Sequence, residues 1–197
     1  MNGRIRTQIS GKYSPGNIGV FQLREKLLSD GIDIAFPVGS SIIQYVLEFA
    51  VTVPHEATTP FHETEVEFYK EIARNPVQVT YNLNEDVEGY MGESTTIETA
   101  YALLCEKPIV LARPISSYSD RLDEPIKEIM SKYEDQAFLA NVDQLTGADA
   151  GLVVREIARS SVDYRLTRAE VGVIVRSARD LTAKYEKTWQ QYQAMQR

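Results

Sequence analysis

The sequence has little cysteine and little histidine. Its 197 residues include one cysteine, Cys105, and two histidines, His55 and His62. A single cysteine excludes an intramolecular disulfide and a zinc centre built from several cysteines. The two histidines lack the short spacing of paired metal ligands, so packing in the core or at the surface is the more frequent role for such residues. We therefore expect no metal and no redox cofactor.

The sequence also lacks a long apolar run and an excess of positive charge. No run approaches the roughly 20 apolar residues of a membrane-spanning helix, and residues 1–6 lack the apolar region of a signal peptide. The 21 basic and 28 acidic residues give a formal net charge of −7, which disfavours nucleic acid as a partner. We expect a cytoplasmic protein with no membrane and no nucleic-acid partner. A small anionic ligand is compatible with this charge, because a helix N-terminus can hold a phosphate.

What the sequence does contain is an alternation of short apolar runs with helical patterns. Such an alternation is typical of a doubly wound α/β fold. We predict a flavodoxin-like (Rossmann-like) five-stranded parallel sheet with the order 2-1-3-4-5. The predicted strands are Ile5–Ile9, Ile32–Phe36, Val77–Leu83, Ile109–Ala112 and Ala137–Val142, and the predicted helices are Ile18–Ser29, Phe61–Arg74, Ile97–Cys105, Asp123–Tyr133 and Asp149–Ser160.

Two segments lie outside this alternation. Residues 38–60 form an insertion near the expected ligand site, where an extra strand, a hairpin arm, or a helical turn followed by a strand each suit the pattern. Residues 167–194 carry apolar side chains at alternating spacings of three and four, which predict a long C-terminal helix with one apolar seam. That seam can pack on its own subunit or on a partner chain. We divide the chain into an α/β domain, residues 1–160, and a helical extension, residues 161–197.

The loop between Leu83 and Ile97 is rich in polar side chains. It contains two glycines, several carboxylates and several hydroxyls. In the predicted strand order it lies beside the loop Ser10–Tyr13, because both follow neighbouring strands at the switch point where open α/β sheets bind ligands. Gly11 permits close approach of the backbone to a ligand. An ordinary strand-to-helix connection is the alternative interpretation of that loop.

Two glutamates in this region each have a structural and a functional interpretation. Thr95 and Glu98 fit a capping box, with Thr95 as N-cap and Glu98 as its partner three residues later. Alternatively, Glu98 is a partly buried carboxylate in the first turn of a helix at the ligand crevice, suited to act at the anomeric carbon of a sugar. Glu65 lies on the apolar face of its helix with Phe61 and Phe68, either as a solvated edge residue, the more frequent case, or as part of a polar site.

Four stretches together carry a resemblance to a known family. They are Ile9-Ser10-Gly11, the pattern Phe61-x-x-Thr64-Glu65-x-x-Phe68-Tyr69-x-x-Ile72, the run Tyr81-Asn82-Leu83-Asn84, and the run from Gly89 to Leu103 followed by Lys107-Pro108-Ile109. These residues resemble the nucleoside 2-deoxyribosyltransferase superfamily, which includes 2′-deoxynucleoside 5′-monophosphate N-glycosidases. The resemblance spans about residues 4–112 and is most specific between Gly89 and Pro108.

The resemblance implies a homo-oligomer with composite active sites that cleaves or transfers at the N-glycosidic bond of a nucleoside or nucleotide. It implies Glu98 as the catalytic nucleophile, which forms a glycosyl-enzyme intermediate. The glycine-bearing loop of the family, which contacts the sugar or its phosphate, matches Ser10 to Tyr13. The expected substrate-binding residues are Ser10, Gly11, Lys12, Tyr13, Asn82, Asn84, Tyr90, Gly92 and Ser94, with Tyr13 and Tyr90 able to stack on a base.

The sequence departs from the family at two acidic positions. The transferases carry an aspartate six residues before the glutamate, where this chain has Gly92, and another at the end of the preceding strand, where it has Asn82 and Asn84. An asparagine can orient a hydroxyl but cannot accept its proton. Assistance to the leaving base then comes from another acid, and Glu93, Asp86 and Glu88 are the candidates. The alternative functions are a catalytically silent nucleotide-binding module of the same fold and an oligomeric α/β domain in which the motif only caps a helix.

Overall fold

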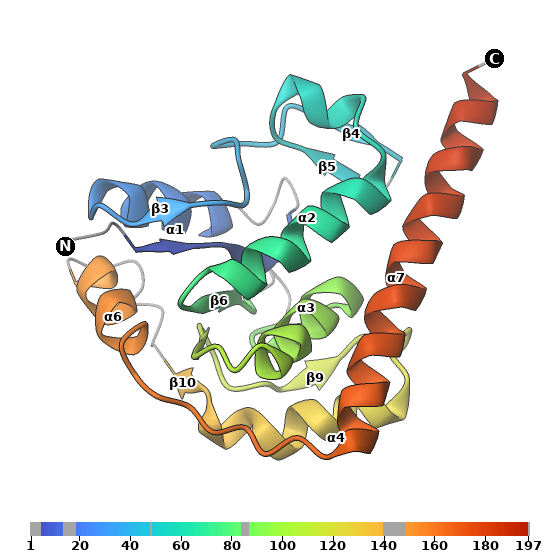
Figure 1. The fold of residues 1–197 in the computed structure, drawn as a ribbon. Coiled ribbons are helices and arrows are strands. Elements are labelled where there is room, and N and C mark those ends of the chain that lie inside the picture. The colour runs from blue at the N-terminus through green and yellow to red at the C-terminus, as the bar shows by residue number, and fades with distance from the viewer. Residues whose placement is uncertain (1–4, 14–18, 48, 84–86, 140–148, 197) are drawn as a thin grey trace.

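The computed structural model describes residues 5–13, 19–47, 49–83, 87–139 and 149–196 (Figure 1). It is a mixed α/β fold in which short parallel strands lie between helices, and the long helix α7 (Arg168–Met195) follows the other elements. The predicted α/β class and the predicted long C-terminal helix are therefore confirmed. Among the described residues, no helix combines the length and the apolar character needed to cross a membrane.

In the described chain, the parallel strands that correspond to the five predicted strands belong to two sheets rather than to one. One sheet has two strands in the order β1-β3, and the other has four in the order β10-β8-β6-β2. Only Gln8 separates β1 from β2, and the backbone N–H of Val79 donates to the Gln8 carbonyl at 3.3 Å. The strands are β1 (Arg6–Thr7), β2 (Ile9–Gly11), β3 (Asp33–Ile34), β6 (Gln78–Tyr81), β8 (Ile109–Leu111) and β10 (Phe138–Leu139).

Helices cover both faces of these strands. Because successive strand residues point to opposite sides, neighbouring residues pack against different helices. Val110 belongs to an apolar cluster with residues of α1 and α6. Its neighbours Ile109 and Leu111 belong to a second cluster, built with α2, α3, α4 and α7. The helices are α1 (Gly19–Ser29), α2 (Phe61–Arg74), α3 (Glu93–Leu104), α4 (Glu124–Tyr133) and α6 (Ala150–Ile157), and a 3₁₀ turn, η2 (Glu134–Gln136), follows α4.

The insertion at residues 38–60 contains a hairpin. Strands β4 (Gln44–Val46) and β5 (Phe49–Val51) pair antiparallel, and the 3₁₀ turn η1 (Pro54–Ala57) follows them. Val46 and Val51 form a small apolar cluster with Phe61 at the start of α2 and with Trp189 of α7. Of the three predicted alternatives, the hairpin arm is the one that forms.

The loop expected to be irregular contains a short strand. β7 (Tyr90–Met91) pairs in parallel with β9 (Ser117–Tyr118), and the N–H of Ser119 donates to the Met91 carbonyl at 2.9 Å. Strands of this length have no periodicity that a sequence pattern can reveal. This small sheet fixes the segment that leads directly into α3.

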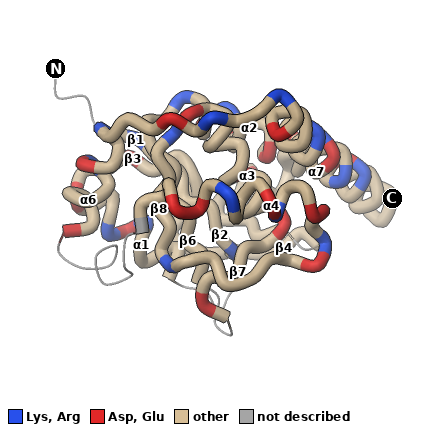
Figure 2. The backbone as a smooth tube through the Cα atoms, turned by 90° about the horizontal axis from the view of Figure 1, so that it is seen from below, with Lys and Arg blue, Asp and Glu red and all other residues tan. Residues whose placement is uncertain are grey.

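Helix α7 packs on its own chain, which is one of the two predicted alternatives for its apolar seam. Ile174, Ala178 and Leu181 are buried in the cluster that α2, α3 and α4 share. A capping box starts the helix: the Glu170 N–H donates to the Thr167 hydroxyl at 3.3 Å, and the Thr167 N–H donates to the Glu170 carboxylate at 2.6 Å. Figure 2 shows acidic and basic residues mixed along α2 and α7, so no single sign of charge dominates that side.

Candidate active site

A cavity of about 570 Å³ lies where several distant segments of the chain meet. Its walls come from the loop after β2, the β4–β5 hairpin, the first turns of α2, the segment from β7 into α3, and the C-terminal half of α7. This volume falls within the range of sites for small organic ligands. The two loops that the sequence predicts to build one pocket do meet here.

Helix α3 begins earlier than predicted, and this changes the interpretation of Glu98. The helix starts at Glu93 with Gly92 as its N-cap and has no side-chain cap. The N–H of Thr96 donates to the Gly92 carbonyl at 2.9 Å. The predicted capping box of Thr95 and Glu98 is therefore wrong, because Glu98 is the sixth residue of the helix rather than the third. Its carboxylate is not used on the helix terminus.

The Glu98 side chain faces the cavity while being almost fully removed from water. It is 7% exposed and forms part of the cavity wall. Burial raises the pKa of Glu98 to about 7, and a hydrogen bond from the Ser10 hydroxyl acts in the opposite direction. Buried carboxyls behave in this way because a low-dielectric site disfavours their charged form. A carboxyl that titrates near neutrality is suited to catalysis.

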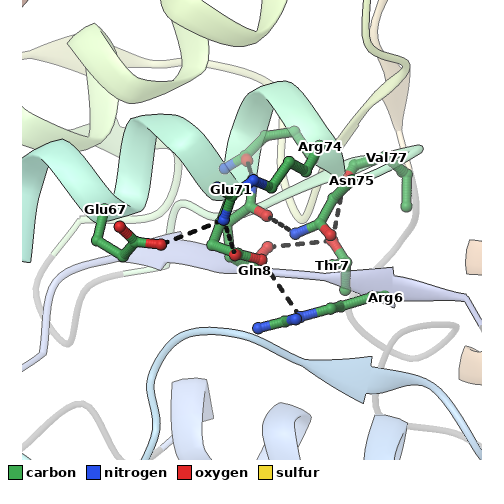
Figure 3. A network of polar contacts seen from close by, with 9 residues as sticks. Arg6, Thr7, Gln8, Glu67, Glu71, Arg74, Asn75 and Val77 are labelled. Atoms are coloured by element: carbon green, nitrogen blue, oxygen red, sulfur yellow. Dashed lines mark hydrogen bonds and ion pairs between the residues drawn. The ribbon is translucent and has the colours of Figure 1, made fainter.

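A chain of buried hydrogen bonds runs behind Glu98. The Asn75 amide donates to Gln8 at 2.5 Å, the Gln8 amide donates to Gln78, and the Gln78 amide donates to the Ser10 hydroxyl oxygen at 2.6 Å. Figure 3 shows Asn75 at the end of α2 reaching Gln8 on the strand below. Because Ser10 accepts from Gln78, its single hydrogen is directed to Glu98. This series of hydrogen bonds favours the ionised form of Glu98.

Glu65 is a second buried carboxyl in the same cavity wall. It lies on α2, is 7% exposed, and its Oε1 atom accepts no hydrogen bond from any described residue. Burial raises the pKa of Glu65 well above its usual range and the charge of Glu98 raises it further, while the Tyr69 hydroxyl acts in the opposite direction. The apolar face on which the sequence places Glu65 is the face that borders the cavity, with Phe61 and Phe68 on either side.

Helix α7 closes one side of the cavity, which the sequence did not predict. The Tyr185 hydroxyl hydrogen-bonds to the Ser94 hydroxyl, and Lys184 donates to the Glu93 carboxylate at 2.5 Å. Burial raises the pKa of Tyr185, and the charge of Glu65 adds to this effect. These contacts join α7 to the first turn of α3. Only the heptad-like seam ending at Tyr185 hinted that this part of α7 contacts the body of the chain.

The hairpin and α2 supply an aromatic wall. The rings of Phe49 and Phe61 stack with their centroids 3.8 Å apart, and Tyr185 meets Phe49 edge-on at 4.6 Å. Phe36 stacks on Phe68 with centroids 5.1 Å apart. All five side chains line the cavity. Flat apolar walls of this kind suit a planar, partly polar ring system.

The structure brings most of the predicted substrate-binding residues together. Ser10 is the exception among the loop residues, since it is 1% exposed and lies behind Glu98 rather than on the cavity surface. Glu98 aside, the predicted residues that line the cavity are Gly11, Lys12, Tyr13, Tyr90, Gly92 and Ser94.

The two predicted asparagines do not add to this surface. The Asn82 amide donates to the Arg113 carbonyl at 2.8 Å and accepts from the Arg113 N–H at 2.9 Å, so both ends of its side chain hold the loop after β8. Asn82 is absent from the described cavity wall. Asn84 lies outside the described residues.

The three acids predicted to assist the leaving base occupy different positions. Glu93 lines the cavity but forms an ion pair with Lys184. Glu88 is exposed and lies 3.3 Å from the Arg113 guanidinium, outside the described cavity wall. Asp86 lies outside the described residues. The described part of the chain contains no group of three or more His, Cys, Asp or Glu side chains that could hold a metal ion.

Comparison of the chain with models of protein families, with curated proteins and with solved structures found no match. The chemistry of the cavity accordingly follows from its own side chains. They offer a buried carboxyl held by a donor, a second buried carboxyl with a raised pKa, an aromatic wall and two exposed cations, Lys12 and Arg121, at the border.

Proposed function

We propose that the protein cleaves or transfers at the N-glycosidic bond of a nucleoside or nucleotide, with Glu98 as the nucleophile. The observation that carries this proposal is the buried Glu98 carboxyl, which faces a cavity of ligand size and receives a hydrogen bond from Ser10. A pair of carboxyl groups in one site is the arrangement that enzymes use for reactions at an anomeric carbon.

In the proposed reaction, the Glu98 carboxylate attacks C1′ of the sugar as the bond from C1′ to the base nitrogen breaks. The electron pair of that bond leaves with the base, which gains a proton. Water, or the nitrogen of a second base, then attacks C1′ of the glycosyl ester and releases the Glu98 carboxylate. The first acceptor gives hydrolysis, and the second gives transfer.

The ligand class rests on the walls of the cavity. The aromatic rings of Phe49 and Phe61 and the nearby tyrosines suit a planar base. Lys12 and Arg121 border the cavity with positive charge, which suits a 5′-phosphate. The resemblance of the motif from Gly89 to Pro108 to the nucleoside 2-deoxyribosyltransferase superfamily supports the same substrate class.

We infer the finer architecture as part of the same proposal. Because only Gln8 lies between β1 and β2, we infer that the β1-β3 sheet and the four-stranded sheet together form one flavodoxin-like sheet in the order 2-1-3-4-5. A homo-oligomer with composite active sites, located in the cytoplasm, is what the family resemblance adds. Light scattering during gel filtration tests the oligomeric part, and a mass equal to one chain of 22.2 kDa would contradict it.

A catalytically silent nucleotide-binding module is the second candidate. The observation that favours it is the presence of Gly92 and Asn82 where the transferases carry aspartates. Such a module would keep the cavity and its aromatic wall but release no base.

Incubation with a panel of nucleosides and 5′-monophosphates, followed by chromatography of the free base, distinguishes the two candidates. We expect the wild-type chain to release base and Glu98→Gln to lose at least about a hundredfold in rate, because the amide is a far weaker nucleophile. The matched control is Glu128→Gln, an exposed position on α4, which should retain the wild-type rate. Binding without release in the wild type would favour the silent module.

A further inference from the structure

The described wall of the cavity contains four glutamates, Glu56, Glu65, Glu93 and Glu98, and two of them are committed elsewhere. One oxygen of Glu56 accepts from the Thr52 N–H at 2.6 Å and from the Thr52 hydroxyl at 3.0 Å. Glu93 forms an ion pair with Lys184. These contacts occupy both carboxylates. Glu65 and Glu98 are left to carry out acid–base chemistry.

The surroundings of these two carboxyls differ in a way that separates their protonation states. Glu98 receives the hydrogen of Ser10, which is oriented by Gln78, and a donated hydrogen bond favours a carboxylate. The Oε1 atom of Glu65 is buried and accepts nothing from the described residues. An unpartnered buried oxygen is far less costly on a neutral carboxylic acid than on a carboxylate. One proton shared between the two groups therefore resides on Glu65.

Of the groups that face Glu65 from the neighbouring elements, only the Tyr69 hydroxyl favours its charged form. Besides Glu98 on α3, they are the hydroxyls of Tyr13 after β2, Tyr69 on α2 and Tyr185 on α7. None of these four groups is a cation. Among the described residues, a charge on Glu65 would thus lack a positive partner, whereas a proton on Glu65 relieves its repulsion with Glu98.

We propose that Glu65 is the proton donor and acceptor of the reaction, and that it takes the place of the aspartates that the sequence lacks. This inference rests on the proposed function. As the bond between C1′ and the base breaks, Glu65 gives its proton to the departing base and becomes a carboxylate. Water then attacks C1′ of the Glu98 ester, Glu65 takes the proton of that water, and Glu98 leaves as a carboxylate. Both residues return to their starting states.

The kinetic test compares a purine nucleotide with its N7-methylated form, whose base leaves without gaining a proton. Loss of a general acid costs about a hundredfold or more. We expect Glu65→Gln to lose that factor with the ordinary nucleotide. With the methylated nucleotide, it should release one equivalent of base at close to the wild-type rate and then stall, because no group accepts the proton of water. Glu63→Gln, an exposed position on α2, should match the wild type with both.

Glu65→Asp keeps the acid and should recover part of the rate, which a purely structural role of the side chain would not explain. Equal slowing of Glu65→Gln with both nucleotides, or no slowing with either, would overturn the assignment. Thermal unfolding of each variant checks that the fold is retained.

An infrared measurement tests the location of the proton without any turnover. At a pH well above 7, where the Glu98 carboxyl with its pKa of about 7 is ionised, we expect the carbonyl band of a buried, protonated carboxyl in the wild-type chain and in Glu98→Gln, and its loss in Glu65→Gln. Persistence of the band in Glu65→Gln would overturn the proton assignment by itself. If the wild-type chain releases no base from any substrate, the proposed function fails and the catalytic role of Glu65 fails with it.

Discussion

A carboxylic acid that is removed from water holds its proton more tightly, and this links the cavity to the stability of the protein. The pKa of Glu98 rises from 4.5 to about 7 because the side chain is buried. Between these two pH values the folded chain binds more protons than the unfolded chain. The stabilisation is complete below pH 4.5 and is lost as the pH rises through 7. Burial of Glu65 acts in the same direction.

This linkage gives a prediction for Glu98→Gln, whose amide does not titrate. Between pH 4.5 and a pH above 7, the free energy of unfolding of the wild type should fall by on the order of 3 kcal/mol more than that of the variant. Urea denaturation at a series of pH values measures both curves. Parallel curves for the two proteins would show that Glu98 titrates normally in the folded chain.

At the scale of elements, the hydrogen-bond chain behind Glu98 joins three parts of the fold. It runs from the end of α2, through Gln8 between β1 and β2, to Gln78 on β6 and back to Ser10. The Gln8 and Gln78 amides each donate and accept, so the direction of each link depends on the others. The orientation of one hydroxyl at the cavity thus depends on residues that never reach a ligand.

Gln78→Leu should interrupt this chain. The Gln8 amide then lacks its buried acceptor, which costs about 1–3 kcal/mol of stability. Ser10 also loses the donor that orients it, so the hydrogen bond that lowers the pKa of Glu98 weakens. We expect the pH at which base release is half-maximal on the acid side to move upward.

The control for this variant is Thr80→Val on the same strand, which removes the buried hydrogen bond between Thr80 and Thr99 at 3.0 Å. It should lower stability by a similar amount and leave the pH profile in place. Equal shifts in the two variants would mean that the pH profile responds to strand stability alone.

The bounds of a helix are predicted well only where residues that start or end helices flank it. Helix α2 matches its predicted bounds because Pro60 precedes it and Asn75-Pro76 ends it. The start of α3 was predicted four residues late, because the pattern of Thr95 and Glu98 imitates a capping box. Gly92 caps the helix through its backbone alone, which leaves no side-chain signature. The convergence of the two loops was predictable from strand order, since that order places their starting points side by side.

At the scale of the whole molecule, the cavity joins segments that no local pattern connects. Glu65 comes from the second turn of α2, and Tyr185 comes from α7 about 120 residues later in the sequence. The spacing of apolar residues in α7 predicted a packed seam but not its partner. Glu65 was visible as a carboxylate on an apolar face, yet the same pattern also describes a solvated edge residue. Only the tertiary structure distinguishes a solvated edge residue from a member of a polar site.

A ligand that fills this cavity should stabilise the entire fold. At a hundredfold excess over its Kd, a nucleoside 5′-monophosphate stabilises the folded state by about 2.7 kcal/mol. For a chain of this size, that energy corresponds to a rise in Tm of about 5–10 °C. Glu98→Gln, which binds without turnover, is the protein to use, with inorganic phosphate as the control. No shift with any nucleoside or nucleotide would rule out this ligand class.

Helix α7 is the last element of the cavity wall to be synthesised. A growing polypeptide that has folded through α3 already holds Glu65 and Glu98, but it still lacks Lys184 and Tyr185 and the wall that they complete. The cavity wall is therefore complete only once the last helix has docked.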